Sequence, residues 1–251
     1  MIDFHSLFIR GISLKRESVP SFTSYPFHLP AVSALSEIRF SQPVTFFVGE
    51  NGSGKSTILE AVASSYGFNP EGGTRNFNFS SYQSHSSLDD YLTIIKGVIR
   101  PEDGFFLRAE SFYNVASEIE KLDREGFGGS LLDSYGGKSL HEQSHGESFM
   151  SLFLHKFREN SLYILDEPEA ALSPARQLTM IARMHELVRQ GCQFIIATHS
   201  PIIMAYPNAT IYALNEQGYS KVEYEETEHY QITKTFLDAP ERMLKVLMEE
   251  E

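Results

Sequence analysis

Cysteine is almost absent from this sequence, because Cys192 is the one cysteine among 251 residues. An internal disulfide needs two cysteines, so a disulfide framework is excluded. Long apolar runs are absent as well, since no segment approaches the roughly 18 apolar residues of a membrane-spanning helix. The opening residues, 1–5, lack the charged segment followed by an apolar run that marks an export signal. These absences together predict a soluble, cytoplasmic protein with no membrane span.

Basic residues are in short supply: 21 Lys and Arg stand against 33 Asp and Glu, which gives a formal net charge of −12. Acidic residues gather toward the C-terminal end, in residues 223–228 and 249–251. Tight binding to nucleic acid needs a basic surface that releases counterions. The charge balance therefore argues against intrinsic nucleic-acid binding, although a local basic groove or a basic partner stays open.

A glycine-rich segment, residues 49–57, is the most informative part of the chain. It fits the phosphate-binding pattern G-x-x-x-x-G-K-[ST]. The apolar run 44–48 before it predicts a buried strand, and the uninterrupted segment 58–63 after it predicts a helix. In that context the glycines let backbone N–H groups face an anion, and the helix N-terminus adds its positive end. The predicted phosphate-binding residues are Gly49, Glu50, Asn51, Gly52, Ser53, Gly54, Lys55, Ser56 and Thr57.

Two side chains of this loop have specific predicted roles. Lys55 is expected to reach the β- and γ-phosphates of ATP, and the Ser56 hydroxyl to ligate Mg²⁺. A glycine-rich turn that contains Lys-Ser by chance is the alternative. The order of strand, loop and helix argues against that alternative.

A second apolar run, 161–165, ends in the acidic pair Asp166 and Glu167. A carboxylate at the C-terminal end of a parallel strand beside the loop can hold Mg²⁺ through its water shell, and Asp166 fits that role. Glu167 points elsewhere and is a candidate general base for the attacking water. A surface acidic turn is the alternative, which the apolar residues that lead directly into Asp-Glu-Pro argue against.

Three further short motifs surround these two. Residues 143–148 read Gln-Ser-His-Gly-Glu-Ser, residues 171–174 read Ala-Leu-Ser-Pro, and residues 194–201 read Phe-Ile-Ile-Ala-Thr-His-Ser-Pro. In this order and at these spacings, the set resembles the ATP-binding-cassette (ABC) ATPases over roughly residues 6–215. The forms of the loop and of Ser-His-Gly-Glu are similar to those of the compact soluble bacterial proteins known as AAA-family or predicted ATPases, a non-transport branch.

This resemblance implies the fold. It predicts an α/β P-loop NTPase of ABC type, with a mostly parallel sheet core, an antiparallel β-subdomain and a small helical lid. Residues 1–251 would form a single domain, with the lid at roughly 110–158 and a closing hairpin and helix at roughly 210–251.

The resemblance also implies a dimer. In the family the signature motif, here residues 144–147, faces the γ-phosphate bound by a second subunit. Ser144, Gly146 and Glu147 are therefore predicted to contact ATP across a homodimer, or across a heterodimer with a similar chain. The amphipathic segment 149–157 places Ser144 and Gly146 at a helix N-terminus, which favours anions. A helix cap, with Ser144 as N-cap and Glu147 at N3, is compatible with the same role.

The resemblance also implies roles for four further features of the sequence. His199 looks like the switch histidine, which would bond the γ-phosphate and orient water with Glu167. Residues 171–174 look like the D-loop, with Ser173 where an acidic residue is usual. Glu110, favoured over Gln83, would fill the glutamine-loop place near Mg²⁺. An aromatic residue should stack on adenine, and the candidates are Phe22, Tyr25 and Phe27.

The predicted function is that of a soluble ATPase that hydrolyses Mg·ATP in a nucleotide-sandwiched dimer, as a switch or motor for an unidentified partner. Positions 55 and 144 are only 89 apart, which leaves no room for a long coiled-coil arm between them. The ATP-binding subunit of a membrane transporter is one alternative, which Glu110, Ser173 and the S-x-G-E signature count against. A nucleotide-gated scaffold with little turnover is another. Roles connected with DNA or defence are guesses that no motif specifies.

Overall fold

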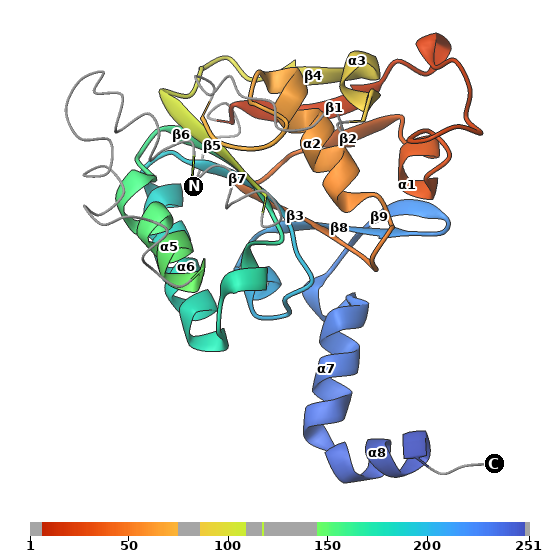
Figure 1. Cartoon of the computed structure of the whole chain (residues 1–251), viewed down its shortest axis with the longest axis vertical. Coiled ribbons are helices and arrows are strands. Elements are labelled where there is room, and N and C mark those ends of the chain that lie inside the picture. The colour runs from red at the N-terminus through yellow and green to blue at the C-terminus, as the bar shows by residue number, and fades with distance from the viewer. Residues whose placement is uncertain (1–6, 75–85, 109–116, 118–144, 249–251) are drawn as a thin grey trace.

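The computed structural model describes residues 7–74, 86–108, 117 and 145–248 (Figure 1). Within these residues the larger sheet has six strands in the order β5-β6-β7-β3-β8-β9. Neighbouring strands run parallel from β5 to β8, and β9 pairs antiparallel with β8. The strands are β3 (Val44–Val48), β5 (Asp103–Arg108), β6 (Ser161–Asp166), β7 (Gln193–Ala197), β8 (Thr210–Asn215) and β9 (Gly218–Val222).

A smaller antiparallel sheet has the order β2-β1-β4, with β1 (Ile9–Leu14) between β2 (Glu37–Arg39) and β4 (Leu92–Lys96). The buried side chain of Gln193, at the start of β7, ties this sheet to the larger one. Its Oε1 accepts hydrogen bonds from the backbone N–H groups of Phe8 and Ile9, each at 2.9 Å, and its Nε2 donates to the Ile9 carbonyl at 2.7 Å.

The strands of the larger sheet separate two apolar cores, because successive strand side chains point to opposite faces. On β7, Phe194 and Ile196 join the core beneath α5 and α6, while Ile195 and Ala197 join the core around α2. Figure 1 shows α2 on one side of the sheet and α5 with α6 on the other. The long helices are α2 (Lys55–Tyr66) and α6 (Pro174–Arg189), and α5 (His145–Ser151) continues into a π-helical turn, Leu152–Lys156.

The thiol of Cys192 lies in the first of these cores, just before β7. Its Sγ is 3.0 Å from the carbonyl oxygen of Arg158, to which it donates a hydrogen bond. Burial raises the pKa of the Cys192 thiol to about 11. The thiol is therefore protonated at neutral pH.

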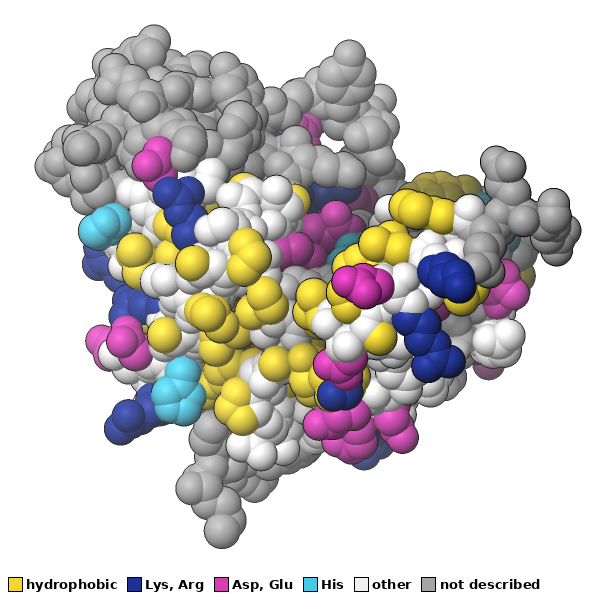
Figure 2. All heavy atoms as spheres, turned by 90° about the horizontal axis from the view of Figure 1, so that it is seen from below, with side chains coloured by type: hydrophobic (Ala, Val, Ile, Leu, Met, Phe, Trp, Pro, Cys, Tyr) yellow, Lys and Arg dark blue, Asp and Glu magenta, His cyan; other side chains and the backbone are white. Residues whose placement is uncertain are grey.

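The chain closes with two helices, α7 (Glu228–Asp238) and α8 (Pro240–Met248), which we call the C-terminal arm. Figure 1 shows the arm projecting away from both sheets, and every residue described in its two helices is at least partly exposed. Figure 2, which views the molecule from the end where the arm projects, shows hydrophobic side chains among charged ones. Exposed large hydrophobic residues of the arm are Ile232, Leu237, Leu244, Val246, Leu247 and Met248.

The remaining described elements are short. Tyr224–Glu226, a 3-10 turn named η8, directly precedes the arm. The others are α1 (Pro30–Ser33), α3 (Leu88–Tyr91) and the 3-10 turns η2 (Arg16–Ser18), η6 (Pro168–Ala171) and η7 (Ile203–Ala205). Every helix within the described residues is too short or too polar to cross a bilayer.

The predicted fold class is confirmed, with a mostly parallel sheet, a separate antiparallel sheet and flanking helices. The strand 44–48, the helix after the loop, the strand ending at Asp166 and the closing hairpin are also confirmed, but two helices follow the hairpin where one was predicted. The predicted lid, roughly 110–158, is described only at residue 117 and from His145 onward. Glu110, Gln83 and Ser144 lie outside the described residues.

Candidate active site

The larger sheet brings three predicted motifs to one edge. The strands β3, β6 and β7 are parallel, with β7 between the other two, so their carboxyl ends lie together. The glycine loop follows β3, Asp166 ends β6 and His199 lies two residues after β7. Carboxyl ends of parallel strands are the usual place for ligand sites in such sheets.

The loop has a backbone that requires glycine. Gly49, Gly52 and Gly54 have φ values of 146°, 81° and 99°, and Gly54 is the left-handed N-cap of α2. A Cβ atom at Gly49 would also collide with the carbonyl oxygen of Leu214 on β8. The loop is therefore packed against its neighbouring strand before it turns into the helix.

Lys55 is buried at the first position of α2. Its Nζ donates to the carbonyl oxygens of Gly49 and Glu50, at 2.9 and 3.0 Å, so the ammonium lies across the loop. Burial lowers the pKa of Lys55, and the carboxylates of Glu167, Asp166 and Glu169 act in the opposite direction. This partly desolvated cation is suited to meet phosphate charge.

The predicted magnesium-binding pair is also in contact. The Ser56 hydroxyl donates to Oδ1 of Asp166 at 2.9 Å. A hydroxyl and a carboxylate are oxygen ligands of the kind that Mg²⁺ prefers, so the residues fit the expected ion. Opposite them lies Arg108, the last residue of β5, whose Nε is 3.8 Å from Oδ2 of Asp166.

Arg108 belongs to a charged group that the sequence analysis missed. Its Nη1 donates to Oε2 of Glu60 at 2.7 Å, and Oε1 of Glu60 accepts from the backbone N–H of Ser86 at 2.8 Å. Arg108 pairs in register with Asp166 across parallel strands. The sequence shows a basic residue at the end of a predicted strand, but it does not show that this strand lies beside the one that ends at Asp166.

Glu167 has an unusual backbone conformation. Its φ and ψ are both 52°, in the left-handed region, and its N–H donates to the Ala197 carbonyl at 2.9 Å. Its Oε1 lies 3.2 Å from Nε2 of His199. A non-glycine residue in this region is strained, and such strain is common where a side chain must be held for function.

Two further side chains complete this group, and sequence reasoning assigned a role to neither. Glu169 is half-buried, its Oε1 accepts from the His199 backbone N–H at 2.5 Å, and burial of the carboxyl raises its pKa. His229 places its Nε2 3.0 Å from Nδ1 of His199. The acidic run Asp-Glu-Pro-Glu, residues 166–169, could have indicated a role for Glu169. No sequence pattern linked His229 to His199, which lies 30 residues earlier in the chain.

The signature residues form a second group. A Cβ atom on Gly146 would lie 2.5 Å from the Ala171 carbonyl oxygen and from a guanidinium nitrogen of Arg176. Arg176 also forms an ion pair with Glu147, with 3.6 Å between Nη2 and Oε1. Ser173 is the N-cap of α6, where its hydroxyl accepts from the Arg176 N–H at 3.4 Å. The segment that resembles the D-loop therefore packs directly beneath the start of the signature helix.

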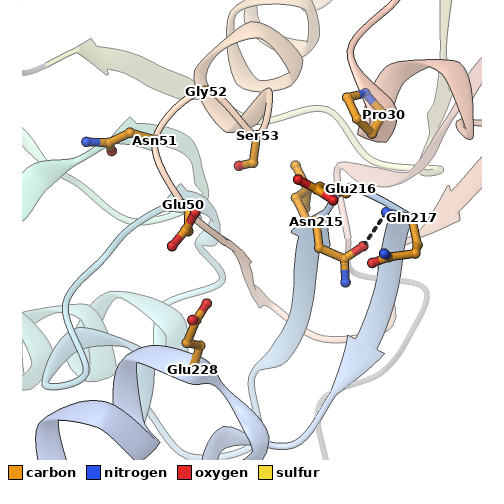
Figure 3. Close-up of a pocket in the computed structure, with 10 residues that line it drawn as sticks. Pro30, Glu50, Asn51, Gly52, Ser53, Asn215, Glu216, Gln217 and Glu228 are labelled. Atoms are coloured by element: carbon orange, nitrogen blue, oxygen red, sulfur yellow. Dashed lines mark hydrogen bonds between the residues drawn. The ribbon is translucent and has the colours of Figure 1, made fainter. Parts of the chain in front are cut away.

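Two hollows border the glycine loop, and they differ in charge. The larger, about 500 Å³, contains the carboxylates of Glu50, Glu216 and Glu228, and Figure 3 shows Glu50 and Glu228 facing each other across it. Such a lining repels phosphate. The smaller, about 190 Å³, contains Lys55 and Ser56, with Glu167 at its side, and is the better place for phosphates.

The three aromatic candidates for adenine stacking lie in different surroundings. Phe27 is buried and packs edge-on against Tyr91, with 5.0 Å between ring centroids. Phe22 has the guanidinium of Arg16 over its ring at 4.6 Å. Tyr25 is 60% exposed and borders the smaller hollow. The geometry favours Tyr25.

Two family models match the chain. One, described as an AAA domain, matches residues 22–129, and the other, described as an AAA ATPase domain, matches residues 134–204. The first therefore contains the glycine loop, and the second contains Asp166, Glu167 and His199.

Sequence relatives come from more than one group. A protein of Caldanaerobacter subterraneus subsp. tengcongensis, named as an ABC transporter ATP-binding protein, is 27% identical over 212 residues, 76% of this chain and 85% of that protein. The ABC transporter G family member STR2 of Medicago truncatula is 25% identical over 172 residues, 63% of this chain and 24% of STR2. The DNA repair protein RAD50 of Drosophila melanogaster is 33% identical over 93 residues, 37% of this chain and 7% of RAD50. This chain thus spans less than a quarter of the last two proteins.

Solved structures of similar shape include cbiO1 of Clostridium perfringens, part of the ABC transporter complex cbiONQ. It has a TM-score of 0.46 at 13% identity, and the match covers 96% of this chain and 100% of that one. The SMC head bound to the winged-helix domain of ScpA also has a TM-score of 0.46, at 14% identity, covering 74% of this chain and 91% of that one.

Proposed function

We propose that this chain, a P-loop ATPase of the ATP-binding-cassette type, hydrolyses Mg·ATP between two protomers and thereby switches their association. The observation that carries the proposal is the meeting of three motifs at one sheet edge. Lys55 lies across the loop, Ser56 contacts Asp166 at 2.9 Å, and Glu167 contacts His199 at 3.2 Å.

In this proposal the loop binds the triphosphate. The backbone N–H groups at the start of α2 face the phosphates, and Lys55 meets the β- and γ-phosphate charge. Ser56 and Asp166 would hold Mg²⁺, which neutralises charge on the β- and γ-oxygens, and Glu110 remains a candidate third residue. Tyr25 is proposed to stack on adenine.

Glu167 is proposed as the general base and His199 as the group that orients the γ-phosphate and water. The Glu167 carboxylate accepts the proton of the attacking water, and the Nε2–H of His199 holds the carboxylate and the phosphate oxygen in place. The strained backbone of Glu167 supports this role, because it fixes a carboxylate beside the loop.

The second protomer would supply the signature helix. Ser144, Gly146 and Glu147 of that protomer are proposed to contact the γ-phosphate. The packing of Gly146 against Ala171 supports the proposal, since it ties the signature helix to the segment that follows Glu167. Loss of the γ-phosphate would remove the bridging contacts and release the dimer. Residues 1–251 act as a single domain in this scheme, with the lid at roughly 110–158.

What the dimer acts on is a separate proposal. We favour an unidentified protein partner, and the negative net charge gives no support for direct binding to nucleic acid. The Caldanaerobacter relative favours a second candidate, the ATP-binding subunit of a transporter. Fractionation of the cells that produce a tagged form of this chain distinguishes the two candidates. A transporter subunit would sediment with the membranes, whereas the favoured candidate would stay in the supernatant.

The mass of the Glu167→Gln variant in solution tests the sandwich. Glutamine keeps the hydrogen bond to His199 but is not a base, so bound ATP should persist. Because a ligand that binds only the associated state stabilises it, light scattering should show a shift from 28.4 kDa to twice that mass on addition of Mg·ATP. The double variant Lys55→Ala, Glu167→Gln is the matched control and should stay monomeric. A monomer in both cases would contradict the homodimer.

A further inference from the structure

The imidazole of His199 lies between two partners. Its Nε2 is 3.2 Å from Oε1 of Glu167, and its Nδ1 is 3.0 Å from Nε2 of His229. The two imidazole rings meet at 61°, with 5.1 Å between centroids. Both ring nitrogens of His199 therefore have hydrogen-bond partners, and these partners determine which nitrogen carries the proton.

An ionised carboxylate only accepts hydrogen bonds. A neutral His199 that bonds Glu167 therefore carries its proton on Nε2, and its Nδ1 is an acceptor. The partner at Nδ1 must then donate, so His229 carries its own proton on Nε2. Burial, then His199 and then Lys55, lower the pKa of His229, while Glu228 and Glu50 act in the opposite direction. A neutral His229 with this one N–H satisfies the acceptor.

We propose that His229 is a positioning residue for hydrolysis: its Nε2–H fixes the tautomer and ring orientation in which His199 presents Nε2–H toward the γ-phosphate. The proposal rests on the roles of Glu167 and His199 given above. A histidine that acts through one nitrogen is commonly oriented by the hydrogen bond at the other. In this chain the hydrogen bond to His199 comes from His229, in the first turn of the projecting helix α7.

The position of His229 gives the arm a connection to the active site. His229 is the second residue of α7, and the arm joins the body at this turn. The Thr227 hydroxyl caps α7 by accepting from Tyr230 N–H at 3.4 Å, and the rings of Tyr230 and Tyr224 are 4.7 Å apart. Movement of α7 away from the loop would withdraw the N–H from His199. Hydrolysis should therefore depend on where the arm is held.

Two substitutions separate the hydrogen bond from the packing. His229→Phe keeps an aromatic ring and removes the N–H, whereas His229→Gln places an amide N–H near the position of Nε2. Loss of an orienting partner typically costs about 10-fold or more. We expect His229→Phe to lower kcat about tenfold with KM for ATP unchanged, and His229→Gln to restore kcat. His185→Phe is the matched control. His185 lies on α6, outside the site, and its Nδ1 is 3.3 Å from the Tyr206 hydroxyl.

A double-mutant cycle tests whether His229 acts through His199. In a His199→Ala background, His229→Phe should lower kcat no further. An equal loss in both backgrounds would overturn the proposal, as would a wild-type kcat for His229→Phe alone.

A readout without hydrolysis separates this proposal from the proposed function. Nitrogen-15 chemical shifts of the full chain report which nitrogen of His199 is protonated. We expect protonation of Nε2 in the wild type and a mixture of tautomers in His229→Phe, with His229→Gln like the wild type. An unchanged tautomer in His229→Phe would refute the role of His229. Equal ATPase rates of wild type and Glu167→Gln would instead refute the proposed function.

Discussion

Replacing Glu167 by glycine should leave a more stable fold than replacing it by alanine, which reverses the usual order of these residues. At ordinary helix or strand positions glycine is less favourable than alanine by roughly 0.5–1 kcal/mol, because its unfolded chain has more freedom. Position 167 has φ and ψ of 52°, where an L-residue with a Cβ is strained by about 1–2 kcal/mol. The difference between the two ranges favours glycine by up to about 1.5 kcal/mol.

The comparison with alanine isolates the backbone. Both variants lose the hydrogen bond to His199 and the carboxylate beside Glu169, so these effects cancel. For a chain of this length about 1 kcal/mol corresponds to a shift of about 2–4 °C in Tm. Calorimetry or urea unfolding of the two variants, both of which we expect to be inactive as ATPases, measures the difference.

A more stable alanine variant would refute the reasoning. It would mean that the left-handed conformation at position 167 is not strained, or that the segment relaxes when the side chain is removed. The expected order would instead show that the fold holds Glu167 beside the loop at a cost in stability, as is common where activity needs a strained conformation.

Two other substitutions test the charges of the site. Lys55→Ala should weaken ATP binding about 100-fold or more in calorimetric titration, because a hydrogen bond to a charged group contributes about 1.5–3 kcal/mol and Lys55 is expected to make two; near-normal affinity would contradict the assignment of the loop. Glu169→Gln should alter the pH dependence of stability. Because burial raises the pKa of Glu169 in the fold, its protonated form stabilises the fold below the ordinary value of 4.5, and this contribution is lost as pH rises through the folded pKa. Urea unfolding from pH 4.5 upward should therefore show the variant gaining stability relative to wild type, and a constant difference would count against a raised pKa.

The parts of the site that follow strands could be predicted from sequence because each motif is local. Residues 44–57 contain a buried strand, a glycine loop and a helix start in one continuous segment. Asp166 likewise ends an apolar run whose burial is complete in the structure. Such patterns depend on neighbouring residues, which sequence periodicity reports directly.

The rest depends on contacts between distant segments. In the sequence the acidic run 223–228 indicates only negative charge, yet it leads through η8 into α7 and so brings His229 to His199. Arg108 reaches Asp166 only because β5 and β6 are neighbours in the sheet. Tertiary pairing of this kind has no local signal in a single sequence.

The buried thiol of Cys192 makes the chain a ready background for site-directed labelling. A reagent that attacks thiolates should leave a buried, protonated thiol unmodified under native conditions. A cysteine introduced at an exposed position of the arm, such as Val246, would then carry the one accessible thiol of the chain. A fluorescent probe placed there can report changes in the surroundings of the arm in each nucleotide state, with the natural cysteine left in place.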